Sequence, residues 1–192
     1  LLKAAIAESF WLSAHFSIRL GPEAAFQAIQ AIISATDPNQ PTACQFEVQT
    51  SITEDAAECV VLRGRTRQNA ASEEWLHSIG VTTESWGENI RSGALPGHVC
   101  TVDGKIVGFC FGSRGTGEIE VVALLPDFEN RGIGRELLDR TCDELAKLGH
   151  TRLFLGCSPD PASRSHGFYR HLGWRSTGTF DKYGDEILEK FV

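Results

Sequence analysis

The chain has 192 residues and a net charge of −7, with 42% hydrophobic and 22% charged residues. This composition is ordinary for a folded domain with one substantial core. The acidic balance argues against general nucleic-acid binding, and no apolar run approaches the ~20 residues that span a bilayer. We therefore expect neither a nucleic acid nor a membrane among its partners.

Residues 1–43 predict a helical extension that ends in a linker. Apolar residues with a helical tendency fill 1–17 and 22–34, and 36–41 has the proline-rich, polar composition of a linker. Lys3 and Glu8 interrupt the first apolar run, which argues against a signal peptide. This arm is a candidate surface for packing on the core or for homodimer formation. Residues 44–192 would form the main domain.

The sequence of the main domain predicts strands and helices in a mixed order. Two early helices are predicted, one from Glu54 and one over 84–90, each preceded by a Ser or Thr that can cap its first turn. A longer helix is predicted after residue 132, and another ends near Gly173, which suits a left-handed C-cap. Strands are predicted at 45–49, 98–102, 106–111, 118–124, 152–157, 174–180 and 186–191.

The most informative segment lies at residues 126–138. The strand at 118–124 is followed by a short charged loop, and Gly-Ile-Gly at 132–134 then opens the longer helix. The first turn of a helix leaves backbone N–H groups unpaired, and two glycines let a ligand approach them closely. The loop is therefore suited to hold a phosphate or pyrophosphate. The P-loop and the dinucleotide fingerprint are excluded, because the Gly-Lys-Ser/Thr ending is missing and Leu137 stands at the third glycine.

Two motifs resemble those of GNAT-type N-acetyltransferases. That family carries Gln/Arg-x-x-Gly-x-Gly/Ala between a strand and a long helix, and here the pattern runs from Glu129 to Gly134, with glutamate at its first position. A later helix in the family ends in Phe-Tyr-x-x-Leu-Gly-Phe/Trp, which matches 168–174 here. The resemblance covers 46–192. It implies an α/β (α+β) GNAT fold, with a mixed, mostly antiparallel central sheet flanked by helices, to which the N-terminal arm is added.

The resemblance also implies an activity and its residues. The chain would move an acetyl group from acetyl-CoA to a primary amine of a small molecule or peptide, by direct attack in a ternary complex. Tyr169 would protonate the departing thiolate, since a phenol with a pKa near ~10 keeps its proton at neutral pH. Glu118 and Glu120 share one face of their strand, and Glu120, closer to the thioester by resemblance, is the favoured base. The pantetheine arm and pyrophosphate would contact Val122, Ala123, Leu124, Asn130, Arg131, Gly132, Ile133, Gly134 and Arg135.

Each proposed site residue also has a structural interpretation without a role in the reaction. Tyr169 could pack on the sheet with its hydroxyl bonded to the backbone, and the two glutamates could both face solvent. Glu129 is expected to point to solvent, because a carboxylate repels a pyrophosphate. The segment with Arg63, Arg65, Arg67 and Asn69 could form an anion subsite or a solvated helix end. Trp75 and Trp86 could line an acceptor pocket or belong to the core.

No metal site is expected, because the histidines and cysteines lack metal-ligand spacing. The six cysteines are expected to be reduced thiols of a cytoplasmic protein. Two other functions stay open. One is a non-catalytic acyl-CoA-binding or sensor module with the same fold, and the other is a structural partner protein that interacts through its N-terminal arm.

Overall fold

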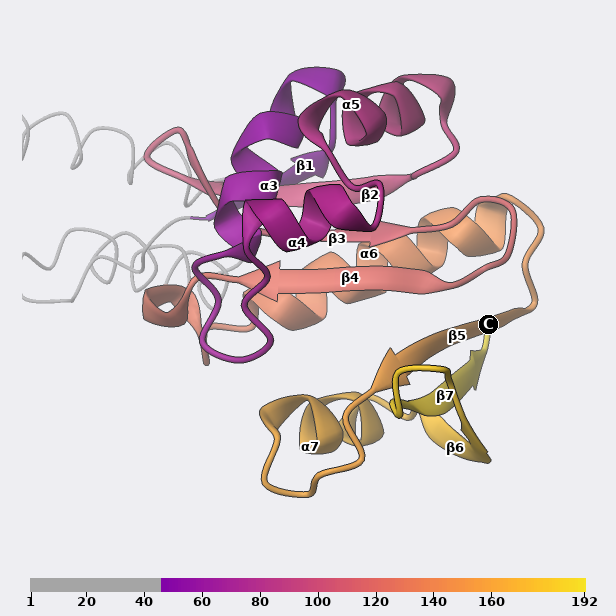
Figure 1. Ribbon diagram of the computed structural model, residues 1–192. Helices are drawn as coiled ribbons and strands as arrows, with labels where there is room; N and C mark the ends of the chain where they lie inside the picture. Colours follow the sequence, from indigo (N-terminus) through magenta and orange to yellow (C-terminus); the bar gives the residue numbers. More distant parts are fainter. Residues whose placement is uncertain (1–45) are drawn as a thin grey trace, which may run out of the picture. The chain divides into compact units, whose positions relative to one another are not determined.

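The computed structural model describes residues 46–192, which form two antiparallel sheets with helices packed on them (Figure 1). The extension and linker predicted at 1–43, and the dimer surface suggested there, lie outside these residues. The first sheet has the order β1-β2-β3-β4 and the second the order β5-β7-β6. The strands are β1 (Glu47–Thr50), β2 (Gly97–Val102), β3 (Lys105–Gly112), β4 (Ile119–Leu124), β5 (Arg152–Cys157), β6 (Arg175–Phe180) and β7 (Glu186–Phe191).

The two sheets join at a single point between their edge strands, β4 and β5. Glu118, just before β4, forms an isolated parallel bridge with Phe154, whose N–H donates to the Gly117 carbonyl at 3.3 Å. Beyond this bridge the two strands diverge toward their carboxyl ends, as the β4 and β5 arrows of Figure 1 show. The facing edges of β4 and β5 therefore have no strand partner among the described residues past the bridge.

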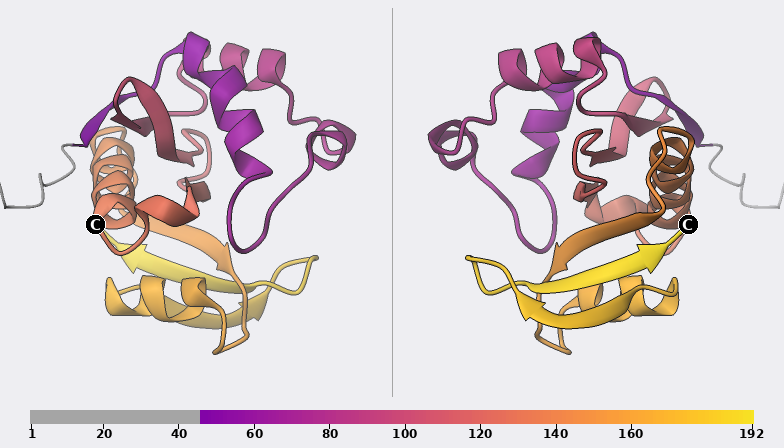
Figure 2. Two further views of the ribbon diagram at one scale, coloured as in Figure 1. Left: turned by 90° about the vertical axis from the view of Figure 1, so that its left-hand side faces the viewer. Right: turned by 90° about the vertical axis from the view of Figure 1, so that its right-hand side faces the viewer.

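Helices cover both faces of the first sheet, and α7 packs on the second (Figure 2). One face of the first sheet carries α6, and the other carries α3, α4 and α5. The described helices are η1 (Thr53–Asp55), α3 (Ala56–Arg63), α4 (Glu73–Ser78), α5 (Thr83–Ser92), η2 (Pro126–Phe128), α6 (Ile133–Lys147) and α7 (Arg164–His171). None of these helices is both long enough and apolar enough to cross a membrane.

Strand alternation divides the core into two clusters. On β3, Phe109 and Phe111 point toward α5, where Trp86 packs edge-on against both rings at centroid distances of 5.7 and 5.3 Å. Cys110 points to the opposite face, toward α6 and its buried Leu137. Because burying a large apolar side chain contributes about 1.5–3 kcal/mol, this two-sided burial anchors β3 between the helices.

The local patterns located most elements. The bounds of β5 and β7 agree with the sequence prediction, and α5 begins after Thr82, whose side chain accepts from the Ser85 N–H at 3.1 Å. Gly173 has the expected left-handed backbone, with φ 87°. α4 was not predicted. It has six residues, too few for a clear period, and only its Ser72 cap, which accepts from the Trp75 N–H at 3.2 Å, marks its start.

One buried histidine couples the fold to pH. His98 on β2 faces α6, where its Nδ1 lies 3.3 Å from the Thr141 hydroxyl, and that hydroxyl donates to the Cys110 carbonyl at 3.4 Å. Burial lowers the pKa of His98, and Arg140 lowers it further. The His98 imidazole therefore binds a proton more tightly in the unfolded chain than in the folded protein. As a result, the folded protein loses stability as the pH falls.

We expect the free energy of unfolding to decrease as the pH falls below about 6.5, the ordinary histidine pKa, and His98→Asn to weaken that dependence. Urea unfolding between about pH 7.5 and about pH 5.5 measures both. His77→Asn, at an exposed position on α4, is the control and should keep the wild-type dependence. Parallel stability curves for wild type and His98→Asn would show that His98 does not cause the effect.

Candidate active site

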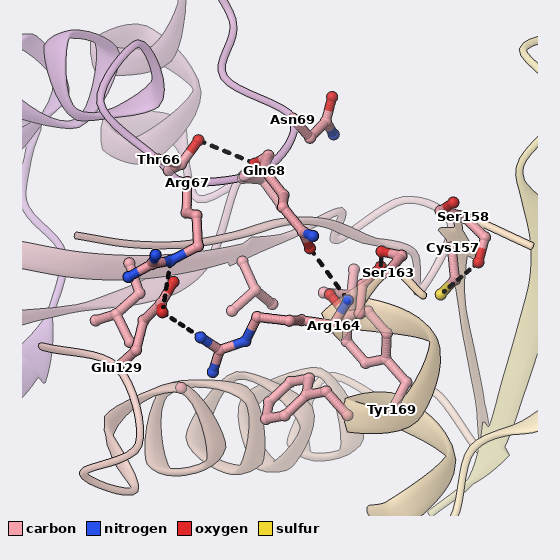
Figure 3. Close-up of a pocket in the computed structure, with 18 of the residues that line it drawn as sticks. Thr66, Arg67, Gln68, Asn69, Glu129, Cys157, Ser158, Ser163, Arg164 and Tyr169 are labelled. Atoms are coloured by element: carbon pink, nitrogen blue, oxygen red, sulfur yellow. Dashed lines mark hydrogen bonds and ion pairs between the residues drawn. The ribbon is translucent and has the colours of Figure 1, made fainter. Parts of the chain in front are cut away.

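A cavity of about 890 Å³ lies where β4 and β5 diverge (Figure 3). Its size falls within the range of about 300–1,000 Å³ that is usual for ligand pockets. Its walls come from six parts of the sequence. These are β4, the glycine loop (residues 129–135), the end of β5, the start of α7, the turn before β7, and the end of α3 with the α3–α4 loop (residues 64–72).

The glycine loop presents unpaired backbone donors to this cavity. Asn130 and Gly132 have left-handed backbone angles, with φ 61° and 82°, so the chain turns sharply before α6. The first backbone bond of the helix runs from the Glu136 N–H to the Gly132 carbonyl at 3.0 Å. The N–H groups of residues 130–135 make no hydrogen bond within the described part of the chain. An anion placed there would find several donors and the positive end of α6.

The side chains of this loop have different surroundings. Five of its residues line the cavity, namely Glu129, Asn130, Gly132, Gly134 and Arg135. Arg131 turns away from it, because its Nη2 donates to the Asp127 carbonyl at 2.8 Å and its guanidinium lies over the Phe128 ring. Ile133 is fully buried in the core. These last two residues can therefore offer a ligand only their backbone N–H groups.

The edge of β4 forms a second polar wall. Val122 and Leu124 line the cavity, whereas the Ala123 side chain is buried in the core on the α5 side. Because the edge of β4 that faces β5 lacks a strand partner, its N–H and C=O groups can pair with an extended ligand, as another strand would.

Tyr169 on α7 stands on the opposite wall. Its ring packs edge-on against Phe168 and Trp174, at centroid distances of 5.1 and 6.1 Å. Burial raises the pKa of Tyr169 well above its ordinary value, and the nearby Cys110 thiol adds to this rise. Its hydroxyl makes no hydrogen bond to any residue in 46–192, so the alternative of a hydroxyl held by the backbone has no support there. The group stays protonated at neutral pH.

The two glutamates at the start of β4, Glu118 just before it and Glu120 within it, differ in position. Glu120 lines the cavity, whereas Glu118 is half-buried outside the lining. Partial burial raises the pKa of both carboxyls, with Asp181 adding to the rise at Glu118 and Glu118 adding to it at Glu120. Glu120 nevertheless keeps an exposed surface, so it can reach both solvent and a ligand.

Several lining residues were not foreseen as such from the sequence. Cys157 ends β5 and Ser158 follows it. Burial raises the pKa of the Cys157 thiol, which donates to the Ser158 carbonyl at 3.5 Å. Asp185 reaches the cavity from the turn before β7. Ser163 and Ser165, at the start of α7, also line it and share a hydrogen bond of 2.8 Å.

The arginine-rich segment also reaches the cavity, which favours a subsite over a solvated helix end. Arg63, Arg67 and Asn69 line the cavity, whereas Arg65 does not. The Arg63 side chain holds the α3–α4 loop by donating to the Asn69 carbonyl at 3.0 Å. Of the two tryptophans considered for an acceptor pocket, Trp86 lies in the core and Trp75 is exposed, and neither lines the cavity.

The expectation that Glu129 points to solvent is wrong. Its side chain is only 14% exposed, and its carboxylate forms ion pairs with Arg67 and Arg164. The sequence could not show this pairing, because the two arginines come from the α3–α4 loop and from the start of α7. Two positive charges offset the repulsion that motivated the expectation.

Comparison with known proteins identifies this architecture. A sequence model described as "Acetyltransferase (GNAT) family" matches residues 56–174. No curated protein matches the chain.

Solved structures share the fold at low identity. The PaiA N-acetyltransferase of Thermoplasma acidophilum, in complex with coenzyme A, matches with a TM-score of 0.65 and 22% identity, over 77% of this chain and 99% of that chain. The yncA protein of Salmonella typhimurium, with acetyl-CoA as its cofactor, matches with a TM-score of 0.60 and 19% identity, over 77% and 94%. The ribosomal-protein-S18-alanine N-acetyltransferase of Escherichia coli matches with a TM-score of 0.55 and 19% identity, over 76% and 91%.

The raised pKa of Tyr169 can be measured directly, because the chain has only two tyrosines. In Tyr183→Phe, we expect little phenolate absorbance up to about pH 11, whereas the same variant unfolded in guanidinium chloride should titrate near about 10. Circular dichroism at each pH checks that the protein remains folded. A folded-state midpoint at the unfolded value would contradict the rise in the Tyr169 pKa attributed to burial.

Proposed function

Because the chain belongs to the GNAT acetyltransferase family, we propose that it transfers the acetyl group of acetyl-CoA to a primary amine by direct attack within a ternary complex. The observation that carries this proposal is the cavity between the diverging strands. It combines unpaired N–H donors, a free strand edge, a protonated phenol and a carboxylate in one space. The likeness to solved structures that hold coenzyme A or acetyl-CoA supports the choice of cosubstrate.

The residues present fit the cofactor in two places. The N–H groups of residues 130–135 would hold the pyrophosphate, with Arg135 adding a positive charge. The backbone of Val122, Ala123 and Leu124 would pair with the amide groups of the pantetheine arm. When bound, acetyl-CoA supplies an activated thioester. This arrangement would direct that thioester along β4, toward the part of the cavity where Tyr169 and Cys157 lie.

In this proposal Tyr169 is the general acid and donates its hydroxyl proton to the departing sulfur. A neutral phenol suits that role, and its raised pKa keeps it neutral. Cys157 is nearby, but burial raises the pKa of its thiol, which disfavours the nucleophilic thiolate. This protonation state supports direct attack by the amine over a covalent intermediate on Cys157.

Glu120 is the proposed general base. An ammonium group must lose a proton before it can attack a carbonyl carbon, and the Glu120 carboxylate at the cavity surface can accept it, directly or through water. Its raised pKa makes it a stronger base than an ordinary glutamate. Glu118 lies farther into the strand junction and is the weaker candidate. The acceptor is a small-molecule or peptide amine in a cytoplasmic setting, where buried thiols such as Cys110 stay reduced.

The alternative is a module that binds acyl-CoA without catalysis. The exposed Glu120 and the protonated Tyr169 in one cavity favour an enzyme, because binding alone needs neither group. Release of CoA thiol with a panel of amines, measured beside a calorimetric CoA titration, tests the choice. Thiol release that depends on an amine supports the enzyme. CoA binding without turnover across the panel would favour the module.

Tyr169→Phe tests the proposed acid. It removes one hydroxyl and keeps the ring packed on Trp174, so CoA affinity should survive while kcat falls roughly 10²-fold or more. Tyr183→Phe makes the same chemical change at a site that is 67% exposed and outside the lining, and should leave kcat unchanged. A normal kcat for Tyr169→Phe, under conditions where chemistry limits the rate, would make Tyr169 a packing residue only.

Glu120→Gln tests the proposed base, with Glu118→Gln as its matched control on the same strand face. We expect Glu120→Gln to lose most activity at low pH, where the amine carries its proton, and to recover partly as the pH rises. Glu118→Gln should keep the wild-type shape of the pH–rate profile. If both variants keep that profile, neither carboxylate is the base.

A further inference from the structure

The family pattern places Gln or Arg at the first position of the glycine loop, and this chain places Glu129 there. A lone carboxylate would weaken an anion site. Here it is the centre of a cluster in which the Arg67 Nε donates to the Glu129 Oε2 at 3.1 Å and Arg164 pairs with the same oxygen. The cluster as a whole therefore carries one net positive charge beside the loop.

The cluster joins three walls of the cavity (Figure 3). The Arg164 Nη2 also donates to the Asn130 Oδ1 at 3.0 Å, and the Arg164 backbone N–H donates to the Gln68 Oε1 at 3.1 Å. Arg67 and Gln68 belong to the α3–α4 loop, Glu129 and Asn130 to the glycine loop, and Arg164 opens α7. Each of these five residues lines the cavity.

The two guanidinium groups keep donors available for a ligand. The side chains of Arg67 and Arg164 are 56% and 46% exposed, whereas Glu129 is almost covered. A guanidinium has five N–H donors, of which Arg67 uses one and Arg164 two in the described contacts. An arginine fork matches the spacing of phosphate oxygens, and here two forks are held beside the N–H groups proposed to bind pyrophosphate.

We propose that Arg67 and Arg164, oriented by Glu129, form a second anion subsite that binds a phosphate group of CoA. Glu129 is a positioning residue, which fixes two flexible side chains before the ligand arrives without cancelling their combined charge. The subsite rests on the proposed function, because it requires CoA in this cavity. The ligand group is either the pyrophosphate or the 3′-phosphate, since both are phosphate oxygens at the same end of one molecule.

Calorimetry with CoA and with 3′-dephospho-CoA tests the subsite. We expect Arg67→Gln and Arg164→Gln each to raise the Kd for CoA about tenfold, because each removes charge-assisted hydrogen bonds. Arg65→Gln removes the same charge from the same loop outside the cavity lining, and should change the Kd less than about twofold. If the variants lose affinity for CoA but not for 3′-dephospho-CoA, the subsite binds the 3′-phosphate. If they lose affinity equally for both ligands, the subsite binds the pyrophosphate.

S-Acetylpantetheine separates phosphate binding from a merely structural effect, because it has the thioester and no phosphate. The kcat/KM of Arg67→Gln and Arg164→Gln with this donor should equal that of the wild type. An equal fall with S-acetylpantetheine and acetyl-CoA would overturn the subsite, and so would wild-type CoA affinity in both variants. If the wild-type protein bound no CoA at all, the proposed function would fail and the subsite with it.

Glu129→Gln decides the role of the carboxylate by the sign of its effect. Removing a repulsive charge would tighten CoA binding. Removing the anchor of two arginines should instead weaken it, by a few-fold on the scale of a partly exposed ion pair. A lower Kd for Glu129→Gln would overturn the positioning role.

Discussion

The single bridge between Glu118 and Phe154 is the constraint on which the site depends. It fixes β4 against β5 at one end, and the right-handed twist and separate helices of the two sheets carry the strands apart beyond it. Backbone groups along the divergent edges must then pair with water or a ligand, since a buried unpaired N–H or C=O is costly. A break in the sheet thus creates both the cavity and its polar wall. Every proposed function of Val122, Glu120 and Tyr169 follows from their place along that break.

Charge within the cavity is distributed unevenly, although the chain is acidic overall. Arg67, Arg135 and Arg164 gather around the glycine loop, where the N-terminus of α6 adds its own positive field. Glu120 and Asp185 line the cavity elsewhere. A ligand with a phosphate end and an acyl end is oriented by such a field, and an incoming ammonium is drawn to the carboxylates. The net charge of −7 gives no hint of this division, because it depends on which residues fold together.

The sequence predicted those features that depend on residues close together in the chain. The glycine loop was located because helix N-termini and glycine leave local signals, and the ends of β5 were located by its apolar run. The partners of Glu129 could not be predicted. They lie 62 and 35 residues away, and only tertiary packing of the α3–α4 loop and α7 brings them together. The divergence of β4 from β5 was equally hidden, because each strand alone has an ordinary pattern. For the same reason the lining position of Cys157 was not foreseen.

The protonation states in the cavity are consistent with one another in physical terms. Around Tyr169 and Cys157, burial penalises any anion, so both the phenol and the thiol hold their protons. At the glycine loop the opposite holds, because unpaired N–H groups and arginines stabilise negative charge. A cofactor whose phosphates are anionic and whose thioester is neutral therefore has one favourable direction in this cavity. A thiolate that formed among the buried groups would be destabilised too, and the phenol of Tyr169 is available to give it a proton, which leaves the negative charge on the tyrosine oxygen. Desolvation destabilises the phenolate as well as the thiolate, so the raised pKa of Tyr169 keeps its proton in place until the sulfur departs and does not itself drive the transfer.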